Sequence, residues 1–431
     1  MIAIEQLFWI ISSSAGVSID TRTITPGQVF FALRGENSDG NKYAAKALEA
    51  GAAWAVVDNP VDESPLYIRV DDSLEALKAV AEYHRKHISN GRLRVIGLTG
   101  TNGKTTTKEL LRAALSARYR VVATEGNLNN EIGVPLSVLK IRPDTEIAII
   151  EMGASHPDDL VPLLKVAKPD IGLITNVGKA HLLGFGSFEG VKHAKGLLYD
   201  YLAANHGRAL LNADDPDLSL MARERGLDTV PYGLDAQGYK ILPTTPQDPM
   251  LSIDLGGTAI HTRLVGAYNA PNVLAALAAA DLMGVPRPEA CAAIEAYSPS
   301  NNRSQLVRTA KNIVICDLYN ANPSSMAVAI DNLSRMEAGR KGVLLGDMRE
   351  LGAESVTEHA AVLRKVLAAG FDRVYLVGEE FMKAARGVPE VTVFPDSEAL
   401  AKFIGENPLS GYTLLVKGSR GIMMEKVLPS L

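Results

Sequence analysis

The sequence predicts an α/β protein with three domains, and three observations lead to this prediction. The chain has 431 residues, which is too many for one simple core and fits about three domains. From residue 94 onward, apolar strand patterns alternate with helix patterns, which favours mostly parallel sheets covered by helices. The stretch Val95–Leu111 reads as a buried strand, a turn rich in glycine and small polar residues, and a helix. This layout binds phosphate groups, so we expect it at the centre of the functional site.

Composition argues against several classes of protein. The net charge is −5 and no tract is rich in lysine or arginine, so we expect no nucleic-acid binding. No apolar run reaches the ~18 residues of a membrane helix, so we expect no membrane insertion. Residues 1–11 are apolar but carry Glu5 and lack a basic segment, so they predict a structural helix and not a signal peptide. Cys291 and Cys316 form no metal-binding spacing and suit a reducing cytoplasm, although the sequence does not exclude a disulfide.

Residues 1–90 are predicted to form a small α/β domain. Strands are expected at residues 29–33, 54–57 and 67–70, with helices at residues 1–11, 43–50 and 73–87. Two polar loops lie between the first elements, one around Thr21 and Arg22 and one at residues 34–41. On composition alone, both are solvated loops. The polar stretch at residues 89–93 is the expected linker to the next domain.

Residues 91–298 are predicted to form the central domain, and residues 299–431 a smaller Rossmann-like domain. Central strands are expected at residues 95–98, 121–123, 147–151, 171–176 and 209–212, so a ligand should bind at the carboxyl ends of a parallel sheet. Residues 228–265 predict an antiparallel appendage with strands near 239–242, 251–255 and 259–264. In the last domain, strands are expected at residues 312–317, 341–345, 373–377, 392–394 and 412–416. This domain lacks G-x-G-x-x-G, so no dinucleotide role is predicted.

The turn after residue 98 carries a near match to the P-loop pattern. Gly100 and Gly103 allow backbone conformations and a close approach that a side chain would block. Lys104 is expected to reach the terminal phosphates, and the hydroxyl of Thr105 to ligate Mg²⁺. The general pattern requires glycine where this chain has Leu98, so on that pattern alone an ordinary strand–helix turn remains the alternative.

Polar residues near two further strand ends are candidates for the same site. Glu151 ends a strand, where a carboxylate is well placed for Mg²⁺, and the alternative is a surface glutamate. His181 follows the next strand end, and the alternative is a hydrogen-bonding loop residue. Ser187 is predicted to cap a helix over residues 188–202 that contains Lys195. On the residues alone, a lysine on a helix is a solvated side chain.

The string Gly100-Thr-Asn-Gly-Lys-Thr-Thr106 resembles the ATP loop of the Mur ligase superfamily, the amide-bond-forming enzymes of peptidoglycan precursor synthesis. Further strings follow in the same order: E-M-G-A-S-H-P from Glu151, G-A-Y-N-A-P-N from Gly266, and D-L-Y-N-A-N-P-S-S-M from Asp317. Residues 346–352, His359 and residues 417–420 continue the match. The resemblance covers essentially the whole chain and is closest to the members that add D-alanyl-D-alanine.

The resemblance implies ATP-binding, metal-binding and catalytic residues. The implied ATP-binding residues are Gly100, Thr101, Asn102, Gly103, Lys104, Thr105, Thr106, Asn269, Asn272, Arg303 and Asp317. The implied metal ligands are Thr105, Glu151, His181 and Lys195, and the implied catalytic residues are Lys104, His181 and Lys195. Lys195 matches a lysine that the family carbamylates with CO₂, although Leu197 stands where members usually have glutamate. Asn269 and Asn272 have helix capping as their alternative role.

The resemblance also implies a substrate-binding set. Its members are Thr21, Arg22, Asn37, Asp39, Asn129, Asn130, Tyr319, Asn320 and Asn322. The first four lie in loops similar to the UDP-binding loops of the family, where Thr21 replaces the usual serine. Asn129 and Asn130 belong to a polar loop that in similar sequences lies near the muramoyl-peptide substrate and the γ-phosphate.

The implied reaction is ATP-dependent addition of D-alanyl-D-alanine to UDP-N-acetylmuramoyl-tripeptide through an acyl phosphate. The implied cofactors are ATP, Mg²⁺ and a carbamylated Lys195, and the expected partners are the two substrates. We expect a cytoplasmic monomer. Two alternatives remain open: a sister ligase with another acceptor, such as MurE or folylpolyglutamate synthetase, and a non-enzymatic P-loop nucleotide switch. The sequence leaves open whether the third residue of the tripeptide is diaminopimelate, lysine or another amino acid.

Overall fold

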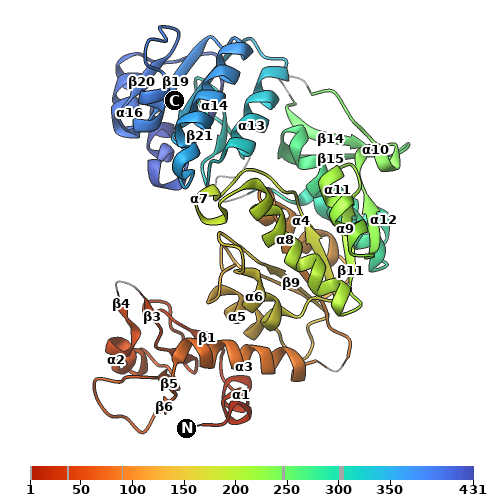
Figure 1. Cartoon of the computed structure of the whole chain (residues 1–431), viewed down its shortest axis with the longest axis vertical. Coiled ribbons are helices and arrows are strands. Elements are labelled where there is room, and N and C mark those ends of the chain that lie inside the picture. Colours follow the sequence, from red (N-terminus) through yellow and green to blue (C-terminus); the bar gives the residue numbers. More distant parts are fainter. Residues whose placement is uncertain (1, 36–37, 90, 245–247, 300–304) are drawn as a thin grey trace.

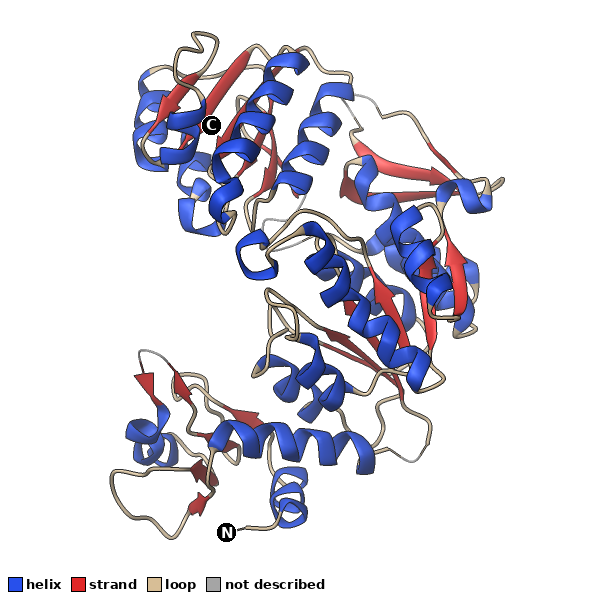
Figure 2. Cartoon of the chain, viewed as in Figure 1, coloured by secondary structure: helices blue, strands red, loops and turns tan. Residues whose placement is uncertain are grey.

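The computed structural model describes residues 2–35, 38–89, 91–244, 248–299 and 305–431. Its elements form three α/β groups that follow one another along the chain, from the N-terminal group at the bottom of Figure 1 to the C-terminal group at the top. Figure 2 shows helices on both sides of the strands in the central and C-terminal groups. The predicted α/β fold with three domains is confirmed.

The N-terminal domain contains a four-stranded parallel sheet with strand order β1-β2-β5-β6. Its elements are α1 (Ile4–Ser12), β1 (Val17–Ser18), β2 (Val29–Phe31), β3 (Arg34–Gly35), β4 (Ser38–Asp39), α2 (Ala44–Glu49), β5 (Trp54–Val57), β6 (Tyr67–Arg69) and α3 (Ser73–His87). The stretch at residues 34–41, predicted as a loop, contains the short antiparallel pair β3–β4. Asp72 caps α3 by accepting hydrogen bonds from two backbone amides of its first turn.

The central domain is built on a six-stranded parallel sheet with strand order β12-β11-β10-β7-β9-β8. Its sheet elements are β7 (Arg94–Thr99), α4 (Lys104–Ser116), β8 (Val121–Ala123), α5 (Gly133–Leu139), β9 (Ile147–Glu151), α6 (Leu160–Ala167), β10 (Ile171–Ile174), α7 (Leu182–Phe185), α8 (Phe188–Ala204), β11 (Arg208–Asn212), α9 (Pro216–Glu224) and β12 (Asp228–Tyr232). Ser187 caps α8 as predicted, accepting a hydrogen bond from the Gly190 amide (3.0 Å).

A smaller antiparallel sheet follows the parallel one. Its strands are β13 (Lys240–Ile241), β14 (Met250–Asp254) and β15 (Ala259–Val265), with α10 (Leu234–Gln237) before them and α11 (Ala270–Leu282) and α12 (Arg287–Ala296) after them. The prediction that the appendage begins at residue 228 is wrong, because β12 pairs in parallel with β11 and extends the main sheet. Pro231 lies within this edge strand, where a missing amide donor is tolerated.

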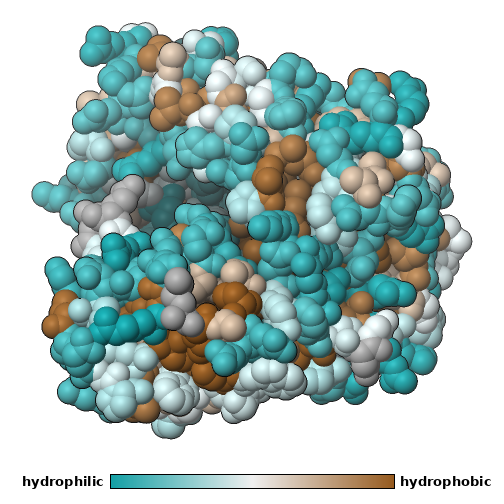
Figure 3. Space-filling model, turned by 60° about the horizontal axis from the view of Figure 1, so that its bottom comes forward, coloured by the Kyte–Doolittle hydropathy of each residue, from teal (hydrophilic) through white to brown (hydrophobic). Residues whose placement is uncertain are grey.

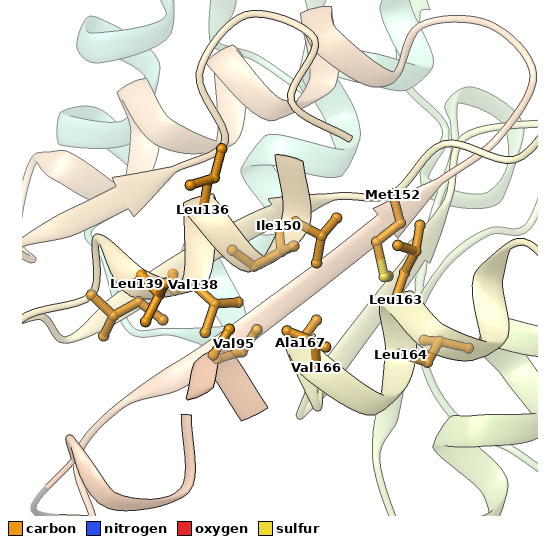
Figure 4. Close-up of a cluster of buried hydrophobic side chains, with 14 of the residues drawn as sticks. Val95, Leu136, Val138, Leu139, Ile150, Met152, Leu163, Leu164, Val166 and Ala167 are labelled. Atoms are coloured by element: carbon orange, nitrogen blue, oxygen red, sulfur yellow. The ribbon is translucent and has the colours of Figure 1, made fainter. Parts of the chain in front are cut away.

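One core joins the N-terminal and central domains. Leu7 of α1 and Leu77 of α3 belong to the same buried cluster as Val95, Leu136 and Leu163 of the central domain. Figure 4 shows side chains of β7, α5, β9 and α6 converging in this cluster. Because burial of apolar surface is worth about 25 cal/mol per Å², this shared core fixes α3 against α5 and α6.

The C-terminal domain has a six-stranded sheet with strand order β16-β17-β21-β18-β19-β20. Its elements are β16 (Gln305–Arg308), β17 (Ile313–Asp317), α13 (Pro323–Arg335), β18 (Arg340–Gly346), η3 (Gly352–Glu354), α14 (Ser355–Ala369), β19 (Arg373–Val377), α15 (Glu379–Ala384), β20 (Thr392–Phe394), α16 (Ser397–Glu406) and β21 (Tyr412–Lys417). All neighbours are parallel except β16, an edge strand that the sequence analysis missed.

The surface and the cysteines bear on the predictions from composition. Across the described residues, the structure has no helix long and apolar enough to cross a membrane. Figure 3 shows apolar side chains gathered in separate patches on a mostly hydrophilic face. Cys291 and Cys316 are both buried free thiols, so the disulfide that the sequence left open does not form.

Candidate active site

The loop between β7 and α4 is fixed to the end of β10. Gly103 precedes α4 with a φ of 82°, a conformation that favours glycine. The backbone amide of Thr101 donates to the carbonyl of Asn176 (3.0 Å). The Lys104 ammonium donates to the carbonyl of Gly100 (2.7 Å), so this cation is held at the loop. The positive end of the 13-residue helix α4 and the ammonium of Lys104 therefore lie at the same loop. This arrangement attracts phosphate.

A buried carboxylate lies beside the loop, at the end of β9. Glu151 is 1% exposed, so the alternative of a surface glutamate is wrong. Its side chain accepts hydrogen bonds from Thr105 Oγ1 (3.0 Å) and Asn129 Nδ2 (2.9 Å). Hydroxyl and carboxylate oxygens are the donors that Mg²⁺ prefers, so Thr105 and Glu151 fit the predicted metal site. Among the described residues, no group of three or more His, Cys, Asp or Glu side chains is arranged to hold a metal ion by itself.

A second lysine of α4 is buried next to Glu151. The Lys108 side chain is fully buried, and its ammonium donates to the carbonyl of Thr124 (2.5 Å). The same ammonium lies 3.1 Å from the Glu109 carboxylate and 4.0 Å from that of Glu151. Lys108 therefore ties the buried carboxylate to the end of β8, where the predicted substrate loop begins. Lys108 is not among the predicted site residues, although its position one helical turn after Lys104 places it on the same face of α4.

Two basic residues complete the central-domain side of the site. His181 precedes α7, and its Nδ1 lies 2.5 Å from Oε2 of Glu350 in the C-terminal domain. Lys195 on α8 is 2% exposed and donates to the carbonyl of Ala154 (3.1 Å), so the alternative of a solvated lysine is wrong.

Burial and mutual repulsion change the acid–base properties of these two residues. Burial lowers the pKa of Lys195 well below its ordinary value, and the charge of Lys104 lowers it further. Burial also lowers the pKa of His181, with Lys104 and Lys195 acting in the same direction and Glu350 opposing them. The charge of Lys104 therefore acts on both neighbouring bases and favours their neutral forms. The shift also enlarges the neutral fraction of the Lys195 amine, and the neutral amine is the form that reacts with CO₂.

The C-terminal domain forms the second wall of a cleft of about 910 Å³. Asn322 Nδ2 donates to Asn102 Oδ1 across the domain boundary (2.9 Å). Asp317 ends β17 and pairs with the buried Lys417 (2.5 Å). The predicted residues that line the cleft are Thr101, Asn102, Gly103, Lys104, Thr106, Asn129, Asn130, Glu151, His181, Asn269, Asn272, Asp317, Tyr319, Asn320 and Asn322. A cleft of this size accommodates a nucleotide.

The two asparagines near α11 do not cap that helix. Asn269 precedes α11 but makes no capping hydrogen bond, and its side-chain amide donates to the carbonyl of Val265 (2.9 Å). Asn272 accepts a hydrogen bond from Thr107 Oγ1 (3.0 Å). The capping alternative is therefore wrong, and this pair connects α11 to the P-loop helix α4.

The predicted residues of the N-terminal domain do not line the cleft. Thr21 and Arg22 lie between β1 and β2, and Arg22 pairs with Asp20 (2.6 Å), which lowers the pKa of Asp20 to about 2. Asp39 ends β4 and accepts a hydrogen bond from the Asn41 amide (3.0 Å). Figure 1 shows β3 and β4 at the far end of this domain, apart from α4. Two further predicted site residues, Asn37 and Arg303, lie outside the described residues.

Comparison with known proteins follows the same division of the chain. A model described as "Mur ligase family, catalytic domain" matches residues 14–87, one described as "Mur ligase middle domain" matches residues 98–280, and one described as "Mur ligase, glutamate ligase domain" matches residues 302–420. The chain is 33% identical over 430 residues to the UDP-N-acetylmuramoyl-tripeptide–D-alanyl-D-alanine ligase of Bacillus subtilis, covering 96% of this chain and 93% of that protein.

Solved structures give the same result. A MurF crystal structure from Acinetobacter baumannii superposes with a TM-score of 0.84 at 30% identity and covers 96% of this chain and 92% of that one. The MurF ligase of Thermotoga maritima in complex with ADP superposes with a TM-score of 0.83 at 26% identity. The match covers 98% of this chain and 97% of that one. This chain belongs to the Mur ligase family.

Proposed function

We propose that this chain is the ATP-dependent, ADP-forming ligase that joins D-alanyl-D-alanine to UDP-N-acetylmuramoyl-tripeptide in peptidoglycan synthesis. The observation that carries the proposal is the composition of the cleft. The P-loop lysine Lys104 and the buried carboxylate of Glu151 lie on one side of it, and asparagine side chains of the C-terminal domain line the other side. Relatives of nearly the same length are named for this reaction, and a relative of the same fold holds ADP.

The first step forms a bond between two anions. The terminal carboxylate of the tripeptide attacks the γ-phosphorus of ATP, an acyl phosphate forms, and ADP leaves. The reaction needs charge neutralisation more than covalent catalysis, because carboxylate and phosphate repel each other. We assign this role to Lys104 and to the N-terminus of α4, with the loop amides of residues 100–106 around the phosphates.

Thr105 and Glu151 would supply oxygen donors to Mg²⁺, which when bound would neutralise phosphate charge. His181 and a carbamylated Lys195 would complete this part of the site. Buried Lys195 supports the carbamate, since CO₂ adds to the neutral amine with loss of a proton and converts the side chain into an anion.

The second step releases phosphate. The amine of D-alanyl-D-alanine attacks the acyl carbon, and the tetrahedral intermediate collapses to an amide and inorganic phosphate. Water must be kept from the acyl phosphate, and a cleft between two domains serves this purpose.

The remaining predicted residues divide by the part of the site that they serve. We propose that Asn269, Asn272, Arg303 and Asp317 contact the nucleotide, and that Asn129, Asn130, Tyr319, Asn320 and Asn322 contact the peptide substrates. Thr21, Arg22, Asn37 and Asp39 are proposed to hold the UDP end of the substrate. We further propose that the enzyme acts as a monomer in the cytoplasm.

A comparison of acceptors tests the proposal against a sister ligase. With UDP-N-acetylmuramoyl-tripeptide present, D-alanyl-D-alanine should support phosphate release, whereas meso-diaminopimelate or L-lysine offered with UDP-N-acetylmuramoyl-L-alanyl-D-glutamate should not. Release with one of those amino acids, and none with the dipeptide, would assign the chain to another branch of the family.

A further inference from the structure

The central and C-terminal domains meet at two residues with unusual backbone conformations. Five residues other than glycine have a positive φ in the described parts of the chain, and two of them are His181 (50°) and Glu350 (64°). Their side chains face each other across the domain boundary, with His181 Nδ1 2.5 Å from Glu350 Oε2. The amide of Leu183 also points to the Glu350 carbonyl (3.4 Å). Such conformations are costly outside glycine and cluster at functional sites, so this contact is a built feature.

Glu350 is held in place by the C-terminal domain. The buried His359 accepts a hydrogen bond from the Met348 amide through Nε2 (3.0 Å), and its Nδ1 lies 2.7 Å from the Ser355 carbonyl. The neighbouring amide of Arg349 donates to the side chain of Ser419 (3.0 Å). The two residues that precede Glu350 are therefore anchored to the C-terminal domain at two separate points.

The pairing has a chemical consequence for His181. A carboxylate only accepts hydrogen bonds, so the proton of the neutral imidazole lies on Nδ1 and the lone pair lies on Nε2. In proteins, a carboxylate at one ring nitrogen fixes the tautomer and orientation of a histidine whose other nitrogen binds a metal.

We propose that Glu350 is a positioning residue that the C-terminal domain supplies to His181. By accepting the Nδ1 proton, Glu350 presents Nε2 to the phosphate and metal side of the cleft only when the two domains are docked. This inference rests on the proposed function, in which His181 serves the phosphate-transfer site. It makes domain docking part of the assembly of that site, in addition to closing it.

A second ion pair across the same boundary provides a matched control. Lys179 Nζ lies 2.7 Å from Glu358 Oε1, and this pair also joins the loop before α7 to the C-terminal domain. Among the described residues, neither member of this pair makes a hydrogen bond or an ion pair with His181. If Glu350 only holds the domains together, removal of either pair should have a similar effect.

The test compares Glu350→Ala, Glu350→Gln and Glu358→Gln with the wild type. We measure kcat and KM, Mn²⁺ affinity by electron paramagnetic resonance in the presence of ADP, and domain docking by small-angle X-ray scattering. Glu350→Ala should lose about 10- to 100-fold in kcat and in Mn²⁺ affinity with unchanged scattering. Glu350→Gln, which keeps an acceptor oxygen, should recover part of the loss, and Glu358→Gln should stay near the wild type.

Two results would overturn the proposal. One is wild-type Mn²⁺ affinity in Glu350→Ala, and the other is an equal loss in Glu350→Ala and Glu358→Gln together with altered scattering, which would make Glu350 a mere domain contact. If the wild type itself forms no amide product, the proposed function fails, while the Mn²⁺ comparison still decides the role of Glu350.

Discussion

At the scale of single residues, burial decides what several side chains can do. Lys195 and Lys108 are both buried lysines, yet they differ in their partners. Lys195 has the Ala154 carbonyl as its hydrogen-bond acceptor, and its burial together with the charge of Lys104 makes its charged form costly. Lys108 lies beside the Glu109 carboxylate, which compensates a charge. The first environment suits a reactive amine, and the second suits a structural cation.

This contrast predicts the effect of changing Lys195. Lys195→Ala should lower turnover by about 100-fold or more, because the anion proposed at this position would be lost. Short-chain carboxylic acids should restore part of the activity by placing a carboxylate in the vacated space. Lys192→Ala on the same helix, where the lysine pairs with Asp217, should keep near-normal activity. Full activity of Lys195→Ala without added acid would show that this lysine has only a structural role.

Local chemistry could be predicted from the sequence for some residues and not for others. The loop from Gly100 to Thr105 and the strand-end Glu151 follow from patterns that span a few positions. Lys108 was missed because a lysine on a helix gives no sign of whether it points inward. Glu350 was missed because its partner His181 lies 169 positions earlier in the chain, and only the docked domains bring the two together.

At the scale of elements, the start of α4 depends on a glycine. Gly103→Ala should weaken ATP binding for two reasons. A methyl group would lie 2.8 Å from Asn272 Oδ1, which Thr107 holds in place, and φ is 82°. The strain of a residue other than glycine in the left-handed conformation is about 1–2 kcal/mol, which alone corresponds to about a tenfold weaker binding of ATP. The ATP KM of the variant should therefore rise about tenfold or more.

Gly238→Ala is the control for this prediction. Gly238 also has a positive φ (68°), but its added methyl group would meet no atom of the described residues within 4 Å. The Gly238→Ala variant should lose a similar amount of folding stability, because its backbone strain is similar, and its ATP KM should be unchanged. An unchanged ATP KM in Gly103→Ala would contradict the assignment of this loop to the nucleotide.

Helix α3 carries a pH-sensitive contact with the central domain. The ring of His84 is buried, with Nε2 2.8 Å from the Ile141 carbonyl, and Nδ1 has no hydrogen-bond partner among the described residues. Burial lowers the pKa of His84 below 6.5, and the charge of Arg142 adds to this effect. The unfolded state therefore binds the proton more readily, so the stabilisation is complete above pH 6.5 and is lost as the pH falls below it.

We expect His84→Gln to flatten this dependence, because the amide can donate to the same carbonyl without titrating. Thermal unfolding midpoints measured on both sides of pH 6.5 should fall more for the wild type than for the variant on the acidic side. Equal slopes would mean that other groups control the acid response.

The elements themselves were largely predictable, and the misses have physical reasons. The apolar runs in the sequence predict β5, β8, β9 and β19, and the predicted bounds agree with those of the structure. The strand β12 was missed because Pro231 interrupts its pattern at a sheet edge, and β16 because it also lies at an edge and follows a polar stretch.

At the scale of the whole molecule, the site exists only where two domains meet. The contacts Asn102–Asn322, Lys179–Glu358 and His181–Glu350 join them around the P-loop. Periodicity along the chain predicts the domains but contains no information on how they dock. The docked arrangement nevertheless decides which residues share the cleft. The predicted UDP-binding loops belong to the N-terminal domain and lie apart from this cleft.

The central claim is that one cleft couples ATP cleavage to amide formation between two substrates. The most direct test measures phosphate release from ATP with Mg²⁺, UDP-N-acetylmuramoyl-tripeptide and D-alanyl-D-alanine, and then with each component omitted. We predict sustained release only in the complete mixture, with a UDP-pentapeptide product identified by mass spectrometry. Parallel reactions with the diaminopimelate and the lysine tripeptide identify the third residue. Measurable ATP binding without release for either tripeptide would contradict the claim and favour a nucleotide switch or a different acceptor.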